Sequence, residues 1–144
     1  MKKAVLFFLI SGMFFYLTSN LIVPLIEFDL FKSSLMHQSP KIKLNHDKVA
    51  YFLFIIVFMP LIVMTIFYSI SIFFFRKKVW VGILVCIGIF MLNYIFTWIG
   101  INSYIISKIV LTSNSTFTVF ITLLICLFFG VFFILKGIKN IQKR

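Results

Sequence analysis

The residues best suited to chemistry lie close together in one stretch of the chain, residues 27–48. It holds every acidic residue and both histidines of the 144-residue sequence: Glu27, Asp29, His37, His46 and Asp47. Carboxylates and imidazoles are ligands for metal ions. Their spacing matches no established ligand pattern, and adjacent side chains such as those of His46 and Asp47 point apart in an extended segment. We therefore expect no metal site here, and two interpretations remain: a solvated connector or a surface that binds a partner.

The rest of the sequence offers little further chemistry. It contains no glycine-rich phosphate loop, no HExxH and no Ser/His/Asp arrangement. Cys86 and Cys126 both lie inside apolar runs and form no CxxC pair. We expect no catalytic residues, no cofactor and no enzymatic activity.

The composition of the chain indicates whether it lies in water or in a membrane. Hydrophobic residues make up 62% of the chain, charged residues make up 12%, and the mean hydropathy is +1.16. A short soluble domain would leave many of the 21 phenylalanines exposed to water, whereas a bilayer accepts apolar surface. The net charge of +11 does not indicate nucleic-acid binding, because the lysines and arginines cluster at the ends of apolar runs. The sequence therefore predicts an integral membrane protein.

Four apolar segments are long enough to cross a bilayer, which requires about 20 residues. The predicted fold is a single all-α domain, residues 1–144, with four transmembrane helices at about 4–26, 49–75, 79–101 and 116–136. Outer loops are expected at 27–48 and 102–115, an inner turn at 76–78 and an inner tail at 137–144. The first segment imitates a signal peptide, but no small-x-small cleavage site follows, so we expect an uncleaved helix.

The distribution of positive charge predicts the orientation of these helices. With a cytoplasmic N-terminus, nine basic residues fall inside: Lys2, Lys3, Arg76, Lys77, Lys78, Lys136, Lys139, Lys143 and Arg144. Five fall outside: Lys32, Lys41, Lys43, Lys48 and Lys108. The positive-inside rule therefore predicts an antiparallel up-down bundle with both termini in the cytoplasm. Trp80 and Trp98, near opposite ends of the third span, are expected at the two membrane interfaces.

Small and polar residues inside the spans predict helix contacts. Gly82 and Cys86 are four residues apart in the third span, as are Cys126 and Gly130 in the fourth, and such pairs allow close helix approach. A contact between these two spans is the expectation. Asn93 is expected to form an interhelical hydrogen bond, with contact to a ligand or ion as the alternative.

Other features concern a bend and the outer connectors. Pro60 predicts a kink in the second span, either as a simple bend or as a gating hinge. Residues 28–36 interleave apolar and polar positions and are expected to lie along the membrane interface. The "KIKLN" segment at 41–45 predicts a short extended stretch, and the apolar run at 104–111 is too short to span and is expected to dip into the interface.

Missing residues restrict the function. Proton-coupled pumps need an ionisable residue within the membrane, and none of the four span cores contains one. Four-helix multidrug transporters, thiol-oxidising enzymes and lipoprotein signal peptidases likewise need a glutamate, paired cysteines or paired aspartates that are missing. In size, span count and basic charge the chain resembles the immunity proteins that protect bacteria from pore-forming bacteriocins.

That resemblance, which concerns architecture alone, implies a bacterial inner-membrane protein that acts by protein contact. A partner would bind through the outer loop 27–48 or within the bilayer, and the protein could form oligomers. An accessory subunit of a membrane transport or export complex and a holin-like or channel-like oligomer remain as alternatives. A channel needs a polar stripe along a helix, and Cys86, Asn93 and Thr97 in the third span are the main candidates.

Overall fold

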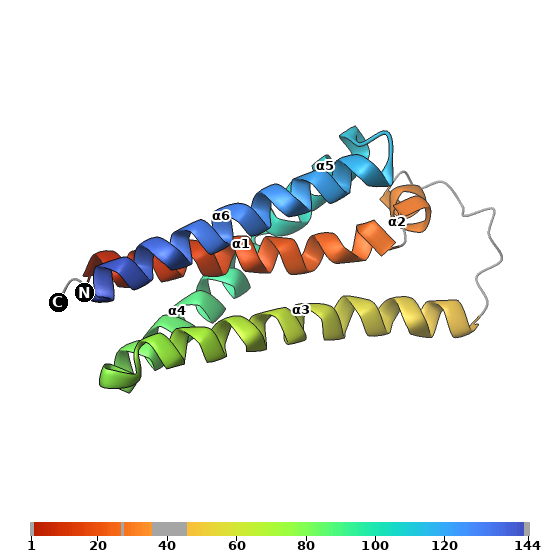
Figure 1. Ribbon diagram of the computed structural model, residues 1–144. Helices are drawn as coiled ribbons and strands as arrows, with labels where there is room; N and C mark the ends of the chain where they lie inside the picture. The colour runs from red at the N-terminus through yellow and green to blue at the C-terminus, as the bar shows by residue number, and fades with distance from the viewer. Residues whose placement is uncertain (1, 27, 36–45, 143–144) are drawn as a thin grey trace.

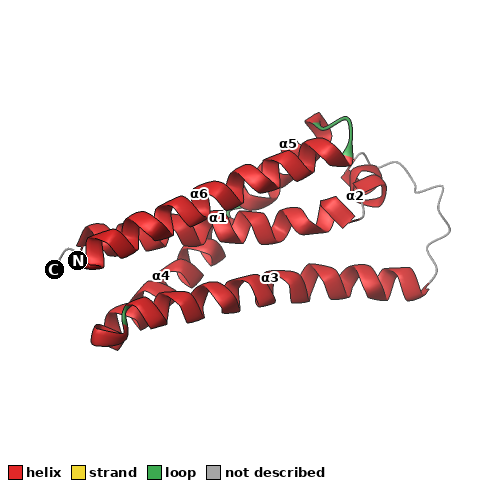
Figure 2. Ribbon diagram, viewed as in Figure 1, coloured by secondary structure: helices red, strands yellow, loops and turns green. Residues whose placement is uncertain are grey.

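The chain folds as a set of helices in a computed structural model that describes residues 2–26, 28–35 and 46–142. No strand occurs among these residues, as Figure 2 shows. In chain order the elements are α1 (Lys2–Ile26), α2 (Phe28–Leu35), α3 (His46–Phe74), the 3₁₀ turn η1 (Arg76–Lys78), α4 (Val79–Trp98), α5 (Ile101–Thr112) and α6 (Thr116–Gln142).

Four helical segments are long and apolar enough to cross a membrane, which confirms an all-helical fold with four candidate membrane spans. The segments are Lys2–Ile26, Val57–Phe74, Arg76–Trp98 and Thr116–Gln142. The fourth candidate span, α6, extends beyond the predicted end at residue 136 and carries Lys136 and Lys139 along its last turns. Trp80 and Trp98 are 79% and 82% exposed at the two ends of α4. Their 18-residue separation corresponds to about 27 Å along a helix, close to the thickness of a hydrocarbon core.

The N-terminal helix α1 is the centre of the assembly. It contacts all of α2, α3, α4, α5 and α6, whereas the contacts of α6 are concentrated on α1. Figure 1 shows both chain termini and the α3–α4 turn at one end of the molecule, with α2 and α5 at the other. We call these the terminal end and the cap end.

Small residues let α1 and α6 approach closely. Ala4 and Ser11 lie seven residues apart on α1, and Gly137 and Gly130 lie seven apart on α6. A Cβ atom added at Gly137 would lie 3.6 Å from the carbonyl oxygen of Ala4, and the Ser11 hydroxyl donates to the carbonyl oxygen of Gly130 at 2.7 Å. Residue numbers thus fall along α6 as they rise along α1. The contact relies on backbone proximity, which compensates for the missing hydrophobic drive in lipid.

Phenylalanine rings extend the same contact on either side of the small residues. Phe14 stacks on Phe129 and Phe133 with ring centroids 5.6 and 5.9 Å apart, and Phe7 stacks on Phe133 at 6.1 Å. Offset aromatic pairs at such distances each contribute about 0.5–1.5 kcal/mol. The pair of helices is therefore held by both close backbone approach and aromatic stacking.

The α3–α4 turn is short and tight. The backbone N–H of Lys78 donates to the carbonyl oxygen of Phe75 at 2.7 Å, closing the turn, and Phe75 itself is buried. Gly82, one turn into α4, lies against α3: an added Cβ would meet the Phe75 Cβ at 3.2 Å and the Ile72 Cα at 3.3 Å. The two helices are therefore neighbours, as a three-residue connection requires.

The third span ends earlier than predicted, at Trp98 rather than residue 101. Gly100 adopts a left-handed conformation with φ of 82°, which L-residues with a Cβ rarely adopt, and this conformation ends α4. Another helix, α5, starts at residue 101, where a loop was expected. It is too short to span, and its buried residues Asn102, Ile106 and Val110 recur every four positions along one face.

Most of the segment predicted to lie at the membrane interface is helical, since α2 covers residues 28–35. α2 buries Phe28 and exposes Asp29. Pro60 is half-buried, and α3 continues through it from His46 to Phe74. The predicted extended stretch at 41–45 lies outside the described residues.

Candidate functional site

A polar cluster joins three helices in the half of the bundle nearer the cap end. We define it as Tyr16 of α1, Asn93 and Thr97 of α4, and Asn102 of α5. The Thr97 hydroxyl donates to the carbonyl oxygen of Asn93 at 2.8 Å. It also accepts from the Asn102 amide at 3.2 Å and lies 3.0 Å from the Tyr16 hydroxyl. Because the single Thr97 hydrogen is already donated, Tyr16 must be the donor in the last bond.

Local structure explains how these residues meet. The left-handed Gly100 ends α4, and α5 begins at the next residue and continues towards the cap end (Figure 1). Thr97 near the end of one helix and Asn102 at the start of the next therefore lie within hydrogen-bonding distance. On α4, the buried residues Gly82, Val85, Ile89 and Asn93 recur at helical spacing, and Ile89 packs against Gly12 of α1. Asn93 follows Ile89 by one turn on the same face. The cluster is therefore a continuation of the α1–α4 contact towards the cap end.

Asn93 has an unusual environment. Its side chain is 6% exposed, and its Nδ2 atom has no hydrogen-bond partner within the described part of the chain. A buried amide donor without an acceptor costs about 1–3 kcal/mol. The interhelical hydrogen bond expected for this amide group is therefore not formed by its Nδ2 atom with any described residue. Asn93 instead takes part in the cluster through its backbone carbonyl.

Replacing Thr97 with valine is expected to destabilise the bundle by about 1–2 kcal/mol, because two interhelical hydrogen bonds lose their shared acceptor. Valine keeps the shape and leaves the buried Asn102 amide without its partner. Unfolding by SDS in mixed micelles would measure the change.

Thr65→Val is the matched control. The Thr65 hydroxyl is exposed and bonds only the carbonyl oxygen of Leu61 in its own helix, at 2.7 Å. Its replacement is expected to change stability by less than about 0.5 kcal/mol. Equal effects of the two substitutions would show that the polar cluster supplies no interhelical energy.

The cap end is closed by two short helices, α2 and α5, which we call the cap. Phe28 of α2 shares one buried cluster with Ile106 and Val110 of α5 and with Leu21 of α1. The Lys32 ammonium donates to the carbonyl oxygen of Ser113 at 2.7 Å and lies 5.3 Å from the centroid of the Phe28 ring. Lys32 thereby satisfies a carbonyl at the end of α5, where a cation also suits the helix dipole. The cap is thus packed against α1, and its two helices are joined by this hydrogen bond.

Three of the five chemistry-bearing residues of the sequence are described by the structure, and these three lie at the cap end (Figure 1). Asp29 is exposed on α2. His46 and Asp47 are the first two residues of α3, so these residues follow one another in a helix instead of the extended segment assumed above. Glu27 and His37 lie outside the described residues. Among the residues that the structure describes, no group of three or more His, Cys, Asp or Glu side chains is placed to hold a metal ion.

The small residues predicted to mediate packing do lie at helix contacts, but not between the third and fourth spans. Gly82 lies against α3, and Cys86 Sγ lies 4.0 Å from the carbonyl oxygen of Tyr68, also on α3. Gly130 lies against Phe15 of α1. The expected contact of α4 with α6 is therefore not made by these residues, because α1 lies between them as a shared partner of both helices.

Cys126 is half-buried beside the cluster that contains Leu21 and Leu123. The sequence analysis did not identify the small residues through which α1 packs closely on its neighbours: Ala4, Ser11 and Gly12 on α1 and Gly137 on α6. The seven-residue spacing of small residues on both helices, Ala4 to Ser11 and Gly130 to Gly137, is the sequence signal for this contact.

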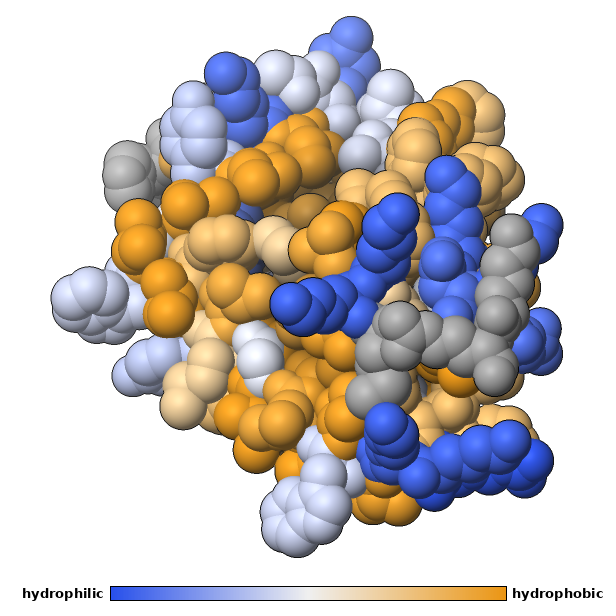
Figure 3. All heavy atoms as spheres, turned by 90° about the vertical axis from the view of Figure 1, so that its left-hand side faces the viewer, coloured by the Kyte–Doolittle hydropathy of each residue, from blue (hydrophilic) through white to orange (hydrophobic). Residues whose placement is uncertain are grey.

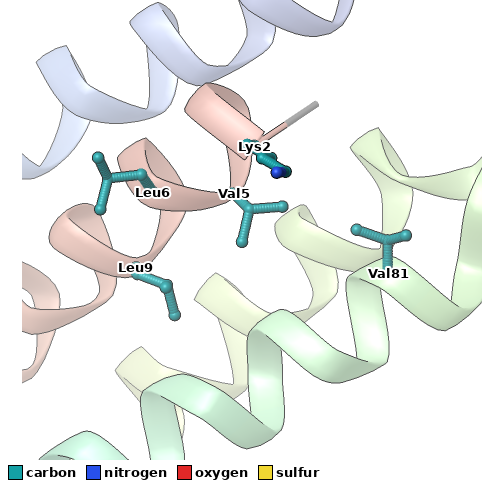
Figure 4. A pocket seen from close by; sticks show the side chains of 5 residues that line it. All are labelled: Lys2, Val5, Leu6, Leu9 and Val81. Carbon is teal, nitrogen blue, oxygen red and sulfur yellow. The ribbon is translucent and has the colours of Figure 1, made fainter.

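Two hollows lie at the terminal end. One, of about 450 Å³, is lined by Val5, Leu6 and Leu9 of α1 and Val81 of α4, with Lys2 at one side, as Figure 4 shows. The other, of about 590 Å³, lies between residues 73–78 and residues 140–142. Figure 3 looks onto this end, where strongly hydrophilic side chains gather mainly on the right and at the top, beside a broad apolar surface.

Comparison with known proteins identifies no relative: no protein-family model, no curated protein and no solved structure matches the chain.

Proposed function

We propose that the chain forms an antiparallel up-down bundle with both termini in the cytoplasm and the cap outside, in the inner membrane of a bacterium. The charge distribution supports this orientation. The terminal end carries seven described basic residues, namely Lys2, Lys3, Arg76, Lys77, Lys78, Lys136 and Lys139. The described basic residues at the cap end are Lys32, Lys48 and Lys108, and Lys32 is already engaged with Ser113. This asymmetry is the one that the positive-inside rule associates with the cytoplasmic side.

The proposed function is protection by protein contact: an immunity-type protein that acts against a membrane-active or pore-forming toxin. The observation that supports it best is the cap. Packing of Phe28 and the Lys32–Ser113 bond hold α2 against α1 and α5, so that exposed Asp29 is presented from an ordered helix. An ordered surface binds a partner at a lower entropic cost than a flexible one. A toxin that enters the bilayer from outside would meet this surface first.

The direct test is a challenge experiment. A toxin-sensitive strain expressing the chain would be exposed to the pore-forming toxin encoded beside its gene, with membrane insertion verified separately. Survival is the expected result, and full killing despite correct insertion would remove the immunity function. Single-channel currents after reconstitution of the pure protein would instead favour the channel-like oligomer.

Crosslinking separates protein contact from a passive membrane role. A photo-crosslinking amino acid at Asp29 is expected to capture a protein partner in the native host, either the toxin or the machinery it attacks. The same crosslinking group at Trp80 is the matched control. Trp80 is exposed near the start of α4, at the terminal end, and is expected to capture no such partner. Capture of a transport or export complex at Asp29 would favour the accessory-subunit function.

A further inference from the structure

The hollow of about 590 Å³ at the terminal end has the composition of an anion-binding site. We call it the turn pocket and define it by its lining, residues 73–78 from the α3–α4 turn and residues 140–142 from the end of α6. Its size falls within the range of about 300–1,000 Å³ that is typical of small-molecule sites. It is formed by two parts of the chain that are more than sixty residues apart.

One side of the turn pocket is strongly basic. Arg76, Lys77 and Lys78 are consecutive and exposed, and no acidic residue occurs in either lining segment. The Arg76 guanidinium carbon lies 5.6 Å from the centroid of the Phe73 ring, which holds this side chain beside the pocket. A guanidinium presents donors in a planar fork that matches the oxygens of a phosphate group.

The other side of the turn pocket is apolar and amide-bearing. Phe73, Phe74 and Phe75 line it from the end of α3, and Ile141 lines it from α6. Asn140 donates its amide to the carbonyl oxygen of Lys136 at 2.8 Å. This bond leaves the Asn140 side-chain oxygen as an acceptor for hydroxyl groups. The lining therefore combines cations for phosphate, an acceptor for hydroxyls and aromatic surface for hydrocarbon.

We propose that the turn pocket binds the headgroup of an anionic phospholipid. In this arrangement the phosphate lies against Arg76, Lys77 and Lys78, and the glycerol and the first part of the acyl chains lie against the phenylalanines. The pocket sits where α3 ends and α4 begins, at the membrane surface of two adjacent spans, which is the depth of lipid headgroups. Basic pockets between transmembrane helices suit anionic headgroups. A bare phosphate ion would use the cations and leave the aromatic side empty.

The natural tryptophans allow a direct measurement. Trp80 lies two residues after Lys78, whereas Trp98 lies at the other end of α4, so the Trp98→Phe protein reports on the terminal end. This protein would be reconstituted into phosphatidylcholine vesicles with a small fraction of brominated phosphatidylglycerol, or of brominated phosphatidylcholine for comparison. Stronger quenching of Trp80 fluorescence by brominated phosphatidylglycerol than by brominated phosphatidylcholine measures the preference of the pocket for the anionic lipid.

Neutralising the pocket is expected to lower the preference for the anionic lipid by about tenfold or more in the Arg76→Gln/Lys77→Gln/Lys78→Gln protein. The matched control is Lys3→Gln/Lys136→Gln/Lys139→Gln, which removes the same charge from the same end without touching the pocket lining, and it is expected to retain most of the preference. Equal loss in both proteins would show general attraction to a basic surface and would overturn the proposal. Displacement of the lipid by millimolar inorganic phosphate would overturn it as well, because the occupant would then be a free anion. Circular dichroism would verify the helix content of both proteins.

Discussion

Replacing Gly12 with alanine is expected to lower the free energy of unfolding by about 1–3 kcal/mol, although it adds a single methyl group. A Cβ at this position would lie 2.7, 2.8 and 2.9 Å from three side-chain atoms of Ile89, closer than real Cβ atoms approach their neighbours. Ile89 is completely buried, and a β-branched side chain in a helix has one strongly preferred rotamer. It cannot turn away, so α1 and α4 must separate locally. Unfolding by SDS in mixed micelles, or steric trapping in bicelles, would measure the loss.

Gly88 provides the matched control in the same helix contact. A Cβ added there would meet only the Cδ2 of Leu9, at 3.2 Å, and this atom is the far end of a flexible side chain. Gly88→Ala is therefore expected to be close to neutral.

A double-mutant cycle tests the proposed cause of the Gly12 effect. Ile89→Ala removes all three crowding atoms, so Gly12→Ala should destabilise the Ile89→Ala protein much less than the wild type. Additive effects of the two substitutions would mean that Ile89 is not the obstacle.

Truncating Phe8 to alanine is expected to destabilise the bundle by about 1–3 kcal/mol. In water-soluble proteins a Phe→Ala change in the core costs about 3–5 kcal/mol. Part of that figure is transfer from water, which is missing when the separated helix still lies in lipid. What remains is the cavity. Phe8 is completely buried, meets Phe75 edge to face at 5.1 Å and lies over Gly137, so its loss opens the contact between α1, α3 and α6.

Phe90→Ala is the control for that truncation. Phe90 is 60% exposed on α4, and within the described structure its ring stacks on no other ring. The Phe90 side chain contacts lipid both in the folded bundle and in the separated helix. Its removal is therefore expected to change stability by less than about 0.5 kcal/mol. Steric trapping applied to both proteins would compare the two effects. A loss at Phe90 as large as that at Phe8 would contradict the placement of Phe8 at the centre of the bundle.

Much of the fold could be predicted because the bilayer limits the choice. In lipid every backbone polar group must be bonded within its own segment, so long apolar runs become helices. Four runs of sufficient length therefore specify four spanning helices, and the three-residue turn at 76–78 makes α3 and α4 neighbours. None of these inferences depends on which side chains meet.

The pairing of the other helices was harder to predict, because it depends on which faces fit. The pairs Gly82–Cys86 and Cys126–Gly130 have similar spacing, yet Gly82 packs on Ile72 and Phe75 while Gly130 packs on Phe15. Small residues predict close approach without naming the partner helix. The central role of α1 follows from its own small residues, which mark more than one face: Ala4 and Ser11 towards α6, and Gly12 towards α4.

The polar cluster could be predicted only in part. Asn93 and Thr97 are visible in the sequence as polar residues in an apolar run. Their link to Asn102 depends on the left-handed Gly100, which turns the chain after Trp98 and starts α5. Glycine allows such a conformation but does not require it. For residues 28–36 the sequence predicted a position along the membrane interface. The bond from Lys32 to Ser113 joins residues 81 apart, which no local pattern predicts.

The orientation of the cap can be measured directly by cysteine labelling in intact cells. Cys86 and Cys126 would first be replaced by alanine, and Asp29→Cys and Lys77→Cys would be introduced singly, since both residues are exposed and lie at opposite ends of the molecule. A membrane-impermeant maleimide is expected to label the protein with the Asp29 substitution at once, and the one with the Lys77 substitution only after the membrane is permeabilised. The reverse pattern would place the cap in the cytoplasm and contradict a role in meeting a partner from outside.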